Sequence, residues 1–260
     1  MMRLLFILLL SFPALTVTAQ KDSLYEKHWL IEKGDTLPYR ILIPYNYNPS
    51  QKYPLVLFLH GAGERGNDNE SQLVHGSGLF LQDSIRDQYP AFVVFPQCPA
   101  ASYWSNVRIS NDSIAKKRIF EFQTGGEPTI AMQMLEKLLQ QLRKDYSIDK
   151  KRMYVGGLSM GGMGTFELVR RNPDMFAAAF PICGGANPAT APVLVKTSWW
   201  IFHGLKDDVV YPEFSRAMAA AIKNNGGSVQ LTLYPGANHN SWDPAFAEKN
   251  LLPWLFSNHK

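Results

Sequence analysis

Residues 154–162 read YVGGLSMGG, an apolar run that leads into a serine placed between glycines. Gly157, Ser159 and Gly161 form the pattern G-x-S-x-G, which a chain of this composition produces by chance about one time in ten. One interpretation is a core strand followed by an ordinary glycine turn. The other is a sharp strand-to-helix turn that exposes the serine hydroxyl at the carboxyl end of a sheet. The surrounding segments decide between the two.

Apolar runs alternate with helical patterns along most of the chain. The runs are typical of strands buried on both faces and cover residues 53–61, 91–97, 152–159, 177–185, 198–204 and 229–236. Two earlier segments, 24–31 and 38–44, predict an antiparallel opening pair. Helical patterns cover 130–146, 164–173, 213–227 and 245–258. Strands that alternate with helices predict a mostly parallel sheet covered on both faces, in one domain.

Residues 99–128 break this alternation, because they are longer than an ordinary connection and carry aromatic side chains among polar ones. The segment leaves a strand whose carboxyl end is expected to face Ser159. We therefore expect it to form a lid or one wall of a substrate pocket. Trp104, with Tyr103, and Trp242 lie in loops near the same rim, where they either stack on a substrate or pack their own loops down.

The N-terminus and the overall composition limit the class of protein. Residues 1–19 contain one arginine and an apolar stretch, and they end in small residues, which predicts a signal peptide cleaved before Gln20. A membrane anchor is the alternative, although polar residues and Pro13 interrupt the run. Without Arg3 the formal net charge of +4 becomes +3, and no basic run interleaves with aromatic residues, so nucleic acid is not an expected partner.

A serine hydroxyl needs a base to accept its proton, and the base needs an acid to orient it. The chain offers six histidines: His28, His60, His75, His203, His239 and His259. His239 follows the last predicted strand, in an irregular loop, which gives the chain order serine, acid, histidine. The preceding strand ends in FHGLKDDVV, which offers Asp207 and Asp208 as the acid.

The negative charge that develops during acyl transfer needs backbone N–H donors. Met160, directly after the serine, supplies the first. The loop HGAGERGND at residues 60–68 is expected to supply the second, because its glycines let the backbone approach a substrate; a merely flexible loop is the alternative.

These segments also carry a resemblance. HGAGERG, IDKKRMYVGGLSMGG, FHGLKDDVV and NHNSWDPAF resemble motifs of the α/β-hydrolase superfamily, and more narrowly of exported esterases related to feruloyl esterases and polyhydroxybutyrate depolymerases, over about residues 36–256. The resemblance implies an eight-stranded α/β-hydrolase fold over residues 20–260. It implies that Asp207 is the acid and that Ala62 provides the second N–H donor.

The sequence therefore predicts a serine hydrolase, exported to the periplasm or the extracellular space, with Ser159, Asp207 and His239 as its triad. The resemblance and the predicted export suggest small-molecule or polysaccharide-linked esters, such as feruloyl or acetyl groups on plant polysaccharides. A serine peptidase and a noncatalytic binding module are the alternatives. We expect no cofactor, no metal site, no stable membrane anchor, and two buried free thiols, Cys98 and Cys183.

Overall fold

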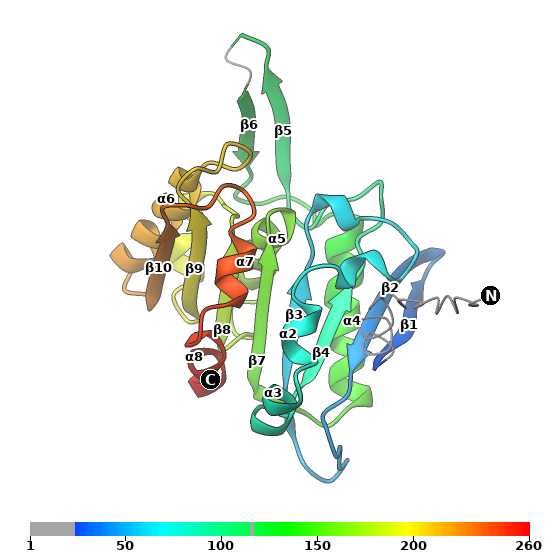
Figure 1. The fold of residues 1–260 in the computed structure, drawn as a ribbon. Helices are drawn as coiled ribbons and strands as arrows, with labels where there is room; N and C mark the ends of the chain where they lie inside the picture. Colours follow the sequence, from blue (N-terminus) through cyan, green and yellow to red (C-terminus); the bar gives the residue numbers. More distant parts are fainter. Residues whose placement is uncertain (1–23, 115–116) are drawn as a thin grey trace, which may run out of the picture.

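An eight-stranded sheet forms the centre of the protein (Figure 1). The computed structural model describes residues 24–114 and 117–260 of the 260-residue chain. The predicted signal peptide, residues 1–19, lies outside them. The strands in sequence order are β1 (Tyr25–Glu32), β2 (Asp35–Leu42), β3 (Tyr53–Leu59), β4 (Phe92–Pro96), β7 (Ile148–Leu158), β8 (Ala178–Ile182), β9 (Ser198–Gly204) and β10 (Val229–Tyr234).

The spatial order of the strands is β1-β2-β4-β3-β7-β8-β9-β10. β2 pairs antiparallel with both of its neighbours, β1 and β4. The strands from β4 to β10 pair in parallel, and β7 lies between β3 and β8. The mostly parallel eight-stranded sheet and the antiparallel opening pair that the sequence predicts are therefore confirmed. Because β7 is central, its carboxyl end has loops from both halves of the sheet around it.

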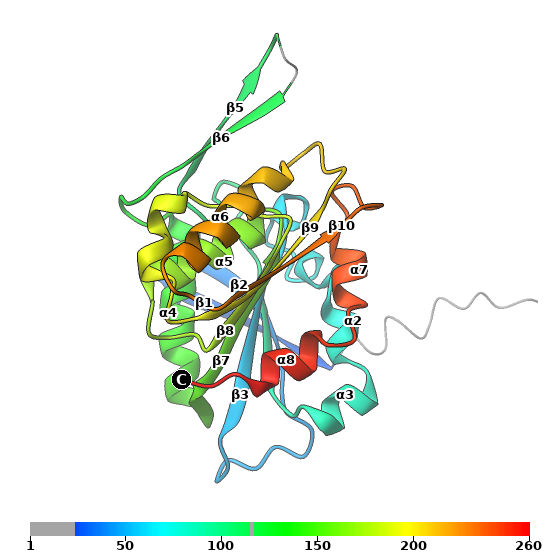
Figure 2. The same cartoon turned by 90° about the vertical axis from the view of Figure 1, so that its left-hand side faces the viewer.

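Helices cover both faces of the sheet (Figure 2). α4 (Ile130–Asp145), α5 (Met160–Arg171) and α6 (Pro212–Asn224) lie on one face. α2 (Ser77–Phe80), α3 (Asp83–Gln88), α7 (Trp242–Phe246) and α8 (Leu251–Ser257) lie on the other. Three short 3₁₀ helices lie in the connections: η1 (Ala62–Glu64), η2 (Ser71–Leu73) and η3 (Pro188–Val193). No helix in the described part of the chain is long and apolar enough to cross a membrane.

α5 begins four residues earlier than the predicted helix at 164–173. The stretch MGGMG at 160–164 has low helix propensity, but close packing requires its glycines. A Cβ atom on Gly161 would lie 1.9 Å from the carbonyl oxygen of Leu59 at the end of β3. The helix can therefore start directly after Ser159 only because this position has no side chain.

The predicted helix at 245–258 is wrong as one element, because the chain forms α7, a turn and then α8. Pro253 explains the break. A proline inside a helix removes a backbone N–H and clashes with the preceding turn, whereas it is tolerated in the first turn. Starting α8 at Leu251 places Pro253 in that first turn.

Residues 99–128 contain a two-stranded hairpin, β5 (Val107–Asp112) and β6 (Lys117–Phe122), which projects beyond the carboxyl edge of the sheet (Figure 1). Its strands pair only with each other, within the described residues. At the base of the hairpin, Phe120 and Phe122 pack against Phe214 of α6, with ring centroids 5.8 and 5.2 Å apart.

Trp104 does not lie open at the rim, as a stacking role would require. Its side chain is fully buried in the core under α5, with its ring 5.5 Å from that of His60. A Cβ atom on Gly164 would lie 2.4 Å from the Trp104 Cβ atom, so α5 packs directly on this residue. The structure therefore favours the packing role for Trp104 over the substrate-stacking role.

Trp104→Ala is expected to lower the free energy of unfolding by about 3–5 kcal/mol, because it removes a large side chain from a closely packed site. Urea denaturation of the purified protein measures the change. Trp29→Ala is the matched control, because Trp29 in β1 is 51% exposed and its loss leaves no cavity. A loss below about 1 kcal/mol at position 104 would contradict the packing role.

Candidate active site

Ser159 lies at the turn between β7 and α5, in a backbone conformation that non-glycine residues rarely adopt. Its φ and ψ angles are 53° and −114°. The backbone N–H of Ser159 donates to the carbonyl of Ile182 at the end of β8, over 2.9 Å, which helps to hold this conformation. Strain of this kind persists only where the surrounding structure fixes it, and it is common at functional sites. The turn therefore places the hydroxyl at the carboxyl edge of the sheet.

Two hydrogen bonds connect Ser159 to His239 and then to Asp207. The Oγ atom of Ser159 lies 2.9 Å from Nε2 of His239. Nδ1 of the same ring lies 2.8 Å from Oδ2 of Asp207. Because an ionised carboxylate only accepts, Nδ1 carries the proton and Nε2 is left to accept from the serine. The three residues come from three different loops, after β7, β9 and β10.

Asp207 is buried, and its carboxylate is surrounded by donors. Oδ1 accepts the backbone N–H groups of Val209 and Val210, over 2.9 and 3.0 Å. Burial alone would raise the pKa of Asp207, but the hydrogen bonds from His203, His239 and Val210 outweigh it and hold the pKa well below its usual range. Asp207 therefore stays ionised. Asp208, the neighbouring alternative, is exposed to solvent.

His203 is a further part of this network, and it was assigned no role from the sequence. Nε2 of His203 lies 3.1 Å from Oδ2 of Asp207 and 2.8 Å from the carbonyl of Val210. Both neighbours are acceptors, so Nε2 carries a proton that the Val210 carbonyl and the Asp207 carboxylate share. The available signal was the spacing of four residues between His203, at the end of β9, and Asp207, which follows it in the same turn.

His203→Phe is expected to lower kcat by about 10- to 100-fold with little change in KM, because the phenyl ring fills the same space but offers the buried carboxylate no donor. Steady-state kinetics on an ester substrate measures the change, and thermal unfolding checks that the fold is intact. His259→Phe, in the exposed terminal tail, is the control. A folded variant with the kcat of the original protein would show that Asp207 needs no support from His203.

The two expected N–H donors come from the residue after Ser159 and from the loop after the neighbouring strand β3. Met160 is the first residue of α5, so its N–H is among those left without a partner inside the helix, at the positive end of the helix dipole. Ala62 begins η1, in the loop after the adjacent strand β3. Arg65 braces that loop by donating to the carbonyl of Ala62 over 3.1 Å and to those of Ala100 and Ser102.

His60 braces the same loop from below. Burial lowers its pKa to about 4, so the ring is neutral. Nδ1 donates to the carbonyl of Gly61 over 2.6 Å, and Nε2 accepts the N–H of Cys98 over 2.9 Å. This ring therefore acts as a structural link between two loops.

Trp242 lies beside His239, with the rings 5.6 Å apart and nearly perpendicular. Of the two tryptophans expected near the substrate, the structure thus brings Trp242 to the site and places Trp104 in the core.

Cys183 and Cys98 are both free and buried, as expected. Among the described residues, Cys183, Asp207 and His239 form the one group whose possible metal-ligating atoms lie within 4.8 Å of one another. Burial raises the pKa of the Cys183 thiol, and a metal ligand must be the thiolate. The relevant atoms of Asp207 and His239 already bond to each other. The group therefore suits the hydrogen-bonded arrangement better than a metal ion.

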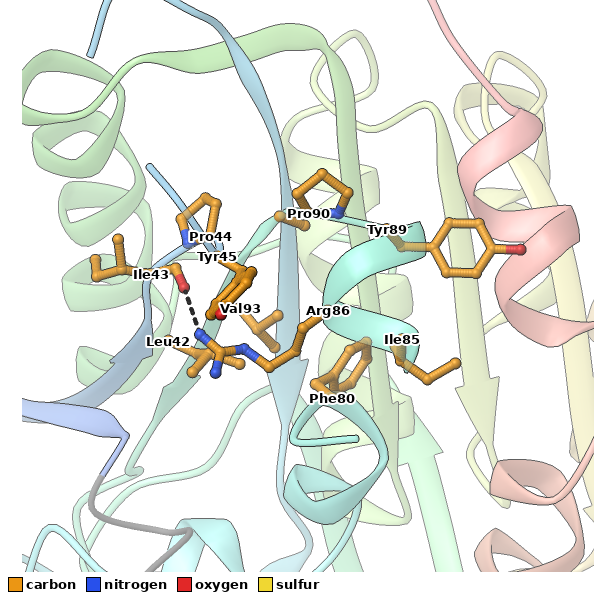
Figure 3. Close-up of a pocket in the computed structure, with 11 residues that line it drawn as sticks. Leu42, Ile43, Pro44, Tyr45, Phe80, Ile85, Arg86, Tyr89, Pro90 and Val93 are labelled. Carbon is orange, nitrogen blue, oxygen red and sulfur yellow. Dashed lines mark hydrogen bonds between the residues drawn. The ribbon is translucent and has the colours of Figure 1, made fainter. Parts of the chain in front are cut away.

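A separate pocket lies between the end of β2 and helices α2 and α3 (Figure 3). The Arg86 side chain crosses it, with the guanidinium 5.3 Å from the centre of the Tyr45 ring and 3.5 Å from the carbonyl of Ile43. No residue of the site around Ser159 lines this pocket. Its lining is mostly apolar, and we assign it to packing.

This sheet order, with a strained serine turn after the central strand, defines the α/β-hydrolase class. Within that class the chain belongs to the Esterase family, whose model matches residues 33–247. A thermostable esterase of known structure superimposes with a TM-score of 0.82 and 32% identity, over 93% of this chain and 64% of the other. A ferulic acid esterase from Anaeromyces mucronatus, solved with ferulic acid, shares the fold with a TM-score of 0.62 and 16% identity, over 86% of each chain.

Two curated relatives are longer proteins. A bifunctional acetylxylan esterase/xylanase from Neocallimastix patriciarum is 27% identical over 69% of this chain and 22% of its own length. An endo-1,4-beta-xylanase/feruloyl esterase from Xylanibacter ruminicola is 25% identical over 81% of this chain and 28% of its own length. The chain thus spans about a quarter of each of these relatives.

Proposed function

We propose that the protein is an exported serine esterase that hydrolyses carboxylic esters through an acyl-enzyme. The observation that carries the proposal is the hydrogen-bonded series Asp207–His239–Ser159, which ends in a hydroxyl held at the carboxyl edge of the sheet. Membership of the Esterase family supports the same chemistry.

In the first half of the reaction, the Oγ atom of Ser159 attacks the ester carbonyl while Nε2 of His239 takes the hydroxyl proton. Asp207 stabilises the imidazolium that forms. The N–H groups of Met160 and Ala62 donate to the oxyanion of the tetrahedral intermediate. This intermediate collapses when the bond to the alkoxy oxygen breaks, and His239 returns its proton to that oxygen. An alcohol leaves, and the acyl group stays on Ser159.

In the second half, a water molecule takes the place of the alcohol. His239 accepts a proton from the water as its oxygen attacks the acyl carbonyl, and the same N–H groups stabilise the second oxyanion. The bond to Oγ then breaks, and the proton on His239 returns to Ser159. A carboxylic acid leaves. Every proton in the cycle moves between groups of the chain, the substrate and water.

For the substrate we propose feruloyl or acetyl esters carried by plant polysaccharides. The names of the relatives, acetylxylan esterase and feruloyl esterase, support this class. Export supports it too, because a polymer must be met outside the cell. The proposal of export rests on residues 1–19, whose charged start, apolar stretch and small residues before Gln20 are typical of a signal peptide.

We assign one wall of the acyl pocket to the hairpin. Phe120 and Phe122 at its base form an apolar cluster with Met163, Val210 and Phe214. Met163 is one turn of α5 beyond Ser159, and its N–H bonds to the Ser159 carbonyl over 3.0 Å. The cluster therefore begins close to the nucleophile and offers aromatic surface to an aryl acyl group.

Phe122→Ala is expected to lower kcat/KM for a feruloyl ester about tenfold more than for an acetyl ester of the same alcohol, because only the aryl group uses the ring. The control is Ile119→Ala, because Ile119 is 43% exposed and, as the neighbour of Phe120 in β6, points to the opposite face of the hairpin. If Phe122→Ala lowered kcat/KM equally for the two esters while the protein stayed folded, the hairpin would have no part in selecting the acyl group.

The proposal is tested by a panel of acetyl, feruloyl and longer acyl esters, run beside peptide substrates on the purified protein. A fluorophosphonate probe, which labels only an activated serine, is run in parallel. We expect labelling and preferential ester turnover. Labelling with preferential peptide cleavage would make the protein a peptidase. No labelling and no turnover would leave a noncatalytic binding module.

A further inference from the structure

The direction of the leaving alcohol follows from the mechanism, so this inference rests on the proposed function. His239 must hand its proton to the alkoxy oxygen, which places the alcohol on the His239 side of Ser159. The hairpin cluster approaches Ser159 through Met163, from α5. The alcohol therefore meets a different set of side chains from those assigned to the acyl group.

Three side chains from separate segments meet on the His239 side. The Trp242 ring contacts His239 and, at a centroid distance of 5.0 Å, the ring of His75. Nε2 of His75 lies 3.8 Å from Oε1 of Glu64. Glu64 belongs to η1, which begins at Ala62. These contacts link His239, the proposed base, to the η1 loop, which carries the expected oxyanion donor Ala62.

Glu64 retains capacity to accept hydrogen bonds. Its side chain is 16% exposed, and its Oε2 atom is buried without a hydrogen-bond partner among the described residues. Nδ1 of His60 lies 3.9 Å from that atom, but its proton is donated to the Gly61 carbonyl. The neutral His60 ring therefore leaves the Glu64 carboxylate uncompensated. Because Oε2 is buried, a ligand hydroxyl can reach this carboxylate only at Oε1, where it offsets part of the cost of burying the charge.

We propose that Glu64, His75 and Trp242 form a subsite for a neutral polyhydroxylated alcohol, that is, a sugar residue of the substrate. The Trp242 ring offers apolar surface to the C–H groups of a sugar. The Glu64 carboxylate accepts from sugar hydroxyls, and the His75 imidazole both donates and accepts. Because Glu64 is acidic, the subsite selects against an alcohol that carries its own carboxylate.

The test compares two esters with the same acyl group, one of methanol and one of a neutral pentose, using the acyl group that the panel ranks first. The quantity measured is the ratio of kcat/KM for the sugar ester to that for the methyl ester. We expect Glu64→Gln and Trp242→Ala each to lower this ratio about tenfold. Glu70→Gln is the matched control, because Glu70 lies in the same connection, exposed and paired with Lys27. It leaves the ratio unchanged.

A binding measurement separates this inference from the proposed function. Saturation-transfer NMR with a neutral xylo-oligosaccharide detects contact without turnover, and we expect the signal to be lost in Glu64→Gln and Trp242→Ala. If the protein cleaves the methyl ester while both variants keep the original ratio, the subsite is overturned and the esterase stands. If no ester is cleaved but the NMR signal depends on Glu64, the esterase proposal fails and the subsite stands. An NMR signal that both variants keep overturns the subsite.

Discussion

Ser159→Ala is expected to lower ester turnover by about three orders of magnitude or more and to abolish labelling by a fluorophosphonate. The variant loses the atom that attacks the ester in the proposed mechanism, while Asp207 and His239 keep their own hydrogen bond. What remains is ground-state binding and stabilisation of the oxyanion, and neither supplies a nucleophile. Stopped-flow or steady-state kinetics measures the loss on the ester of the panel that the original protein cleaves fastest.

The control for this variant is Ser257→Ala, which removes an exposed hydroxyl whose bond goes to the nearby Trp254 carbonyl. It should keep full turnover and full labelling. Among the described residues, the Ser159 side chain hydrogen-bonds only to His239, so the alanine variant should also unfold at nearly the original temperature. Turnover by Ser159→Ala at the original rate would mean that a different group attacks the ester.

The order of the motifs was sufficient to predict the fold. Strands buried on both faces have continuous apolar runs, and the run at 198–204 coincides with β9 at both ends. The meeting of Ser159 and His239 with an acid at 207 or 208 was also predictable, because each follows a strand in a parallel sheet; the choice of Asp207 came from the family resemblance. Parallel strands bring such loops to one edge, so residues that lie 80 positions apart meet in space.

Features that depend on packing between distant segments were not predictable. Nothing in the local sequence shows that Trp104 turns inward against Gly164 rather than outward to the rim. The start of α5 was misplaced for the same reason, since the need for a glycine at 161 comes from Leu59, about a hundred residues earlier. His203 is a different case, because its spacing of four residues from Asp207 was visible in the sequence, although the hydrogen bond itself depends on the shape of the turn.

Asp207→Asn is the second variant for which we expect a large loss, about 10³- to 10⁴-fold in kcat. The carboxylate accepts from Nδ1 of His239 and so holds Nε2 free to take the serine proton. An asparagine amide presents a donor or a neutral oxygen at the same place. It favours the wrong tautomer of the ring, and it cannot stabilise the imidazolium that forms in the transition state. KM should change little, because Asp207 is buried behind the ring and does not reach the substrate.

Asp208→Asn is the matched control, because it makes the same change one position along in the same turn. Asp208 is exposed, and its backbone N–H bonds to the side chain of Asn238, so the substitution leaves the site intact. We expect its kcat to stay within about twofold of the original, as for other surface substitutions. Both variants lose one negative charge near His239, so a difference between their kcat values comes from the position of the carboxylate and not from the loss of charge. If Asp208→Asn were the inactive variant, the acid would be Asp208, and the bond between Asp207 and His239 would have no part in catalysis.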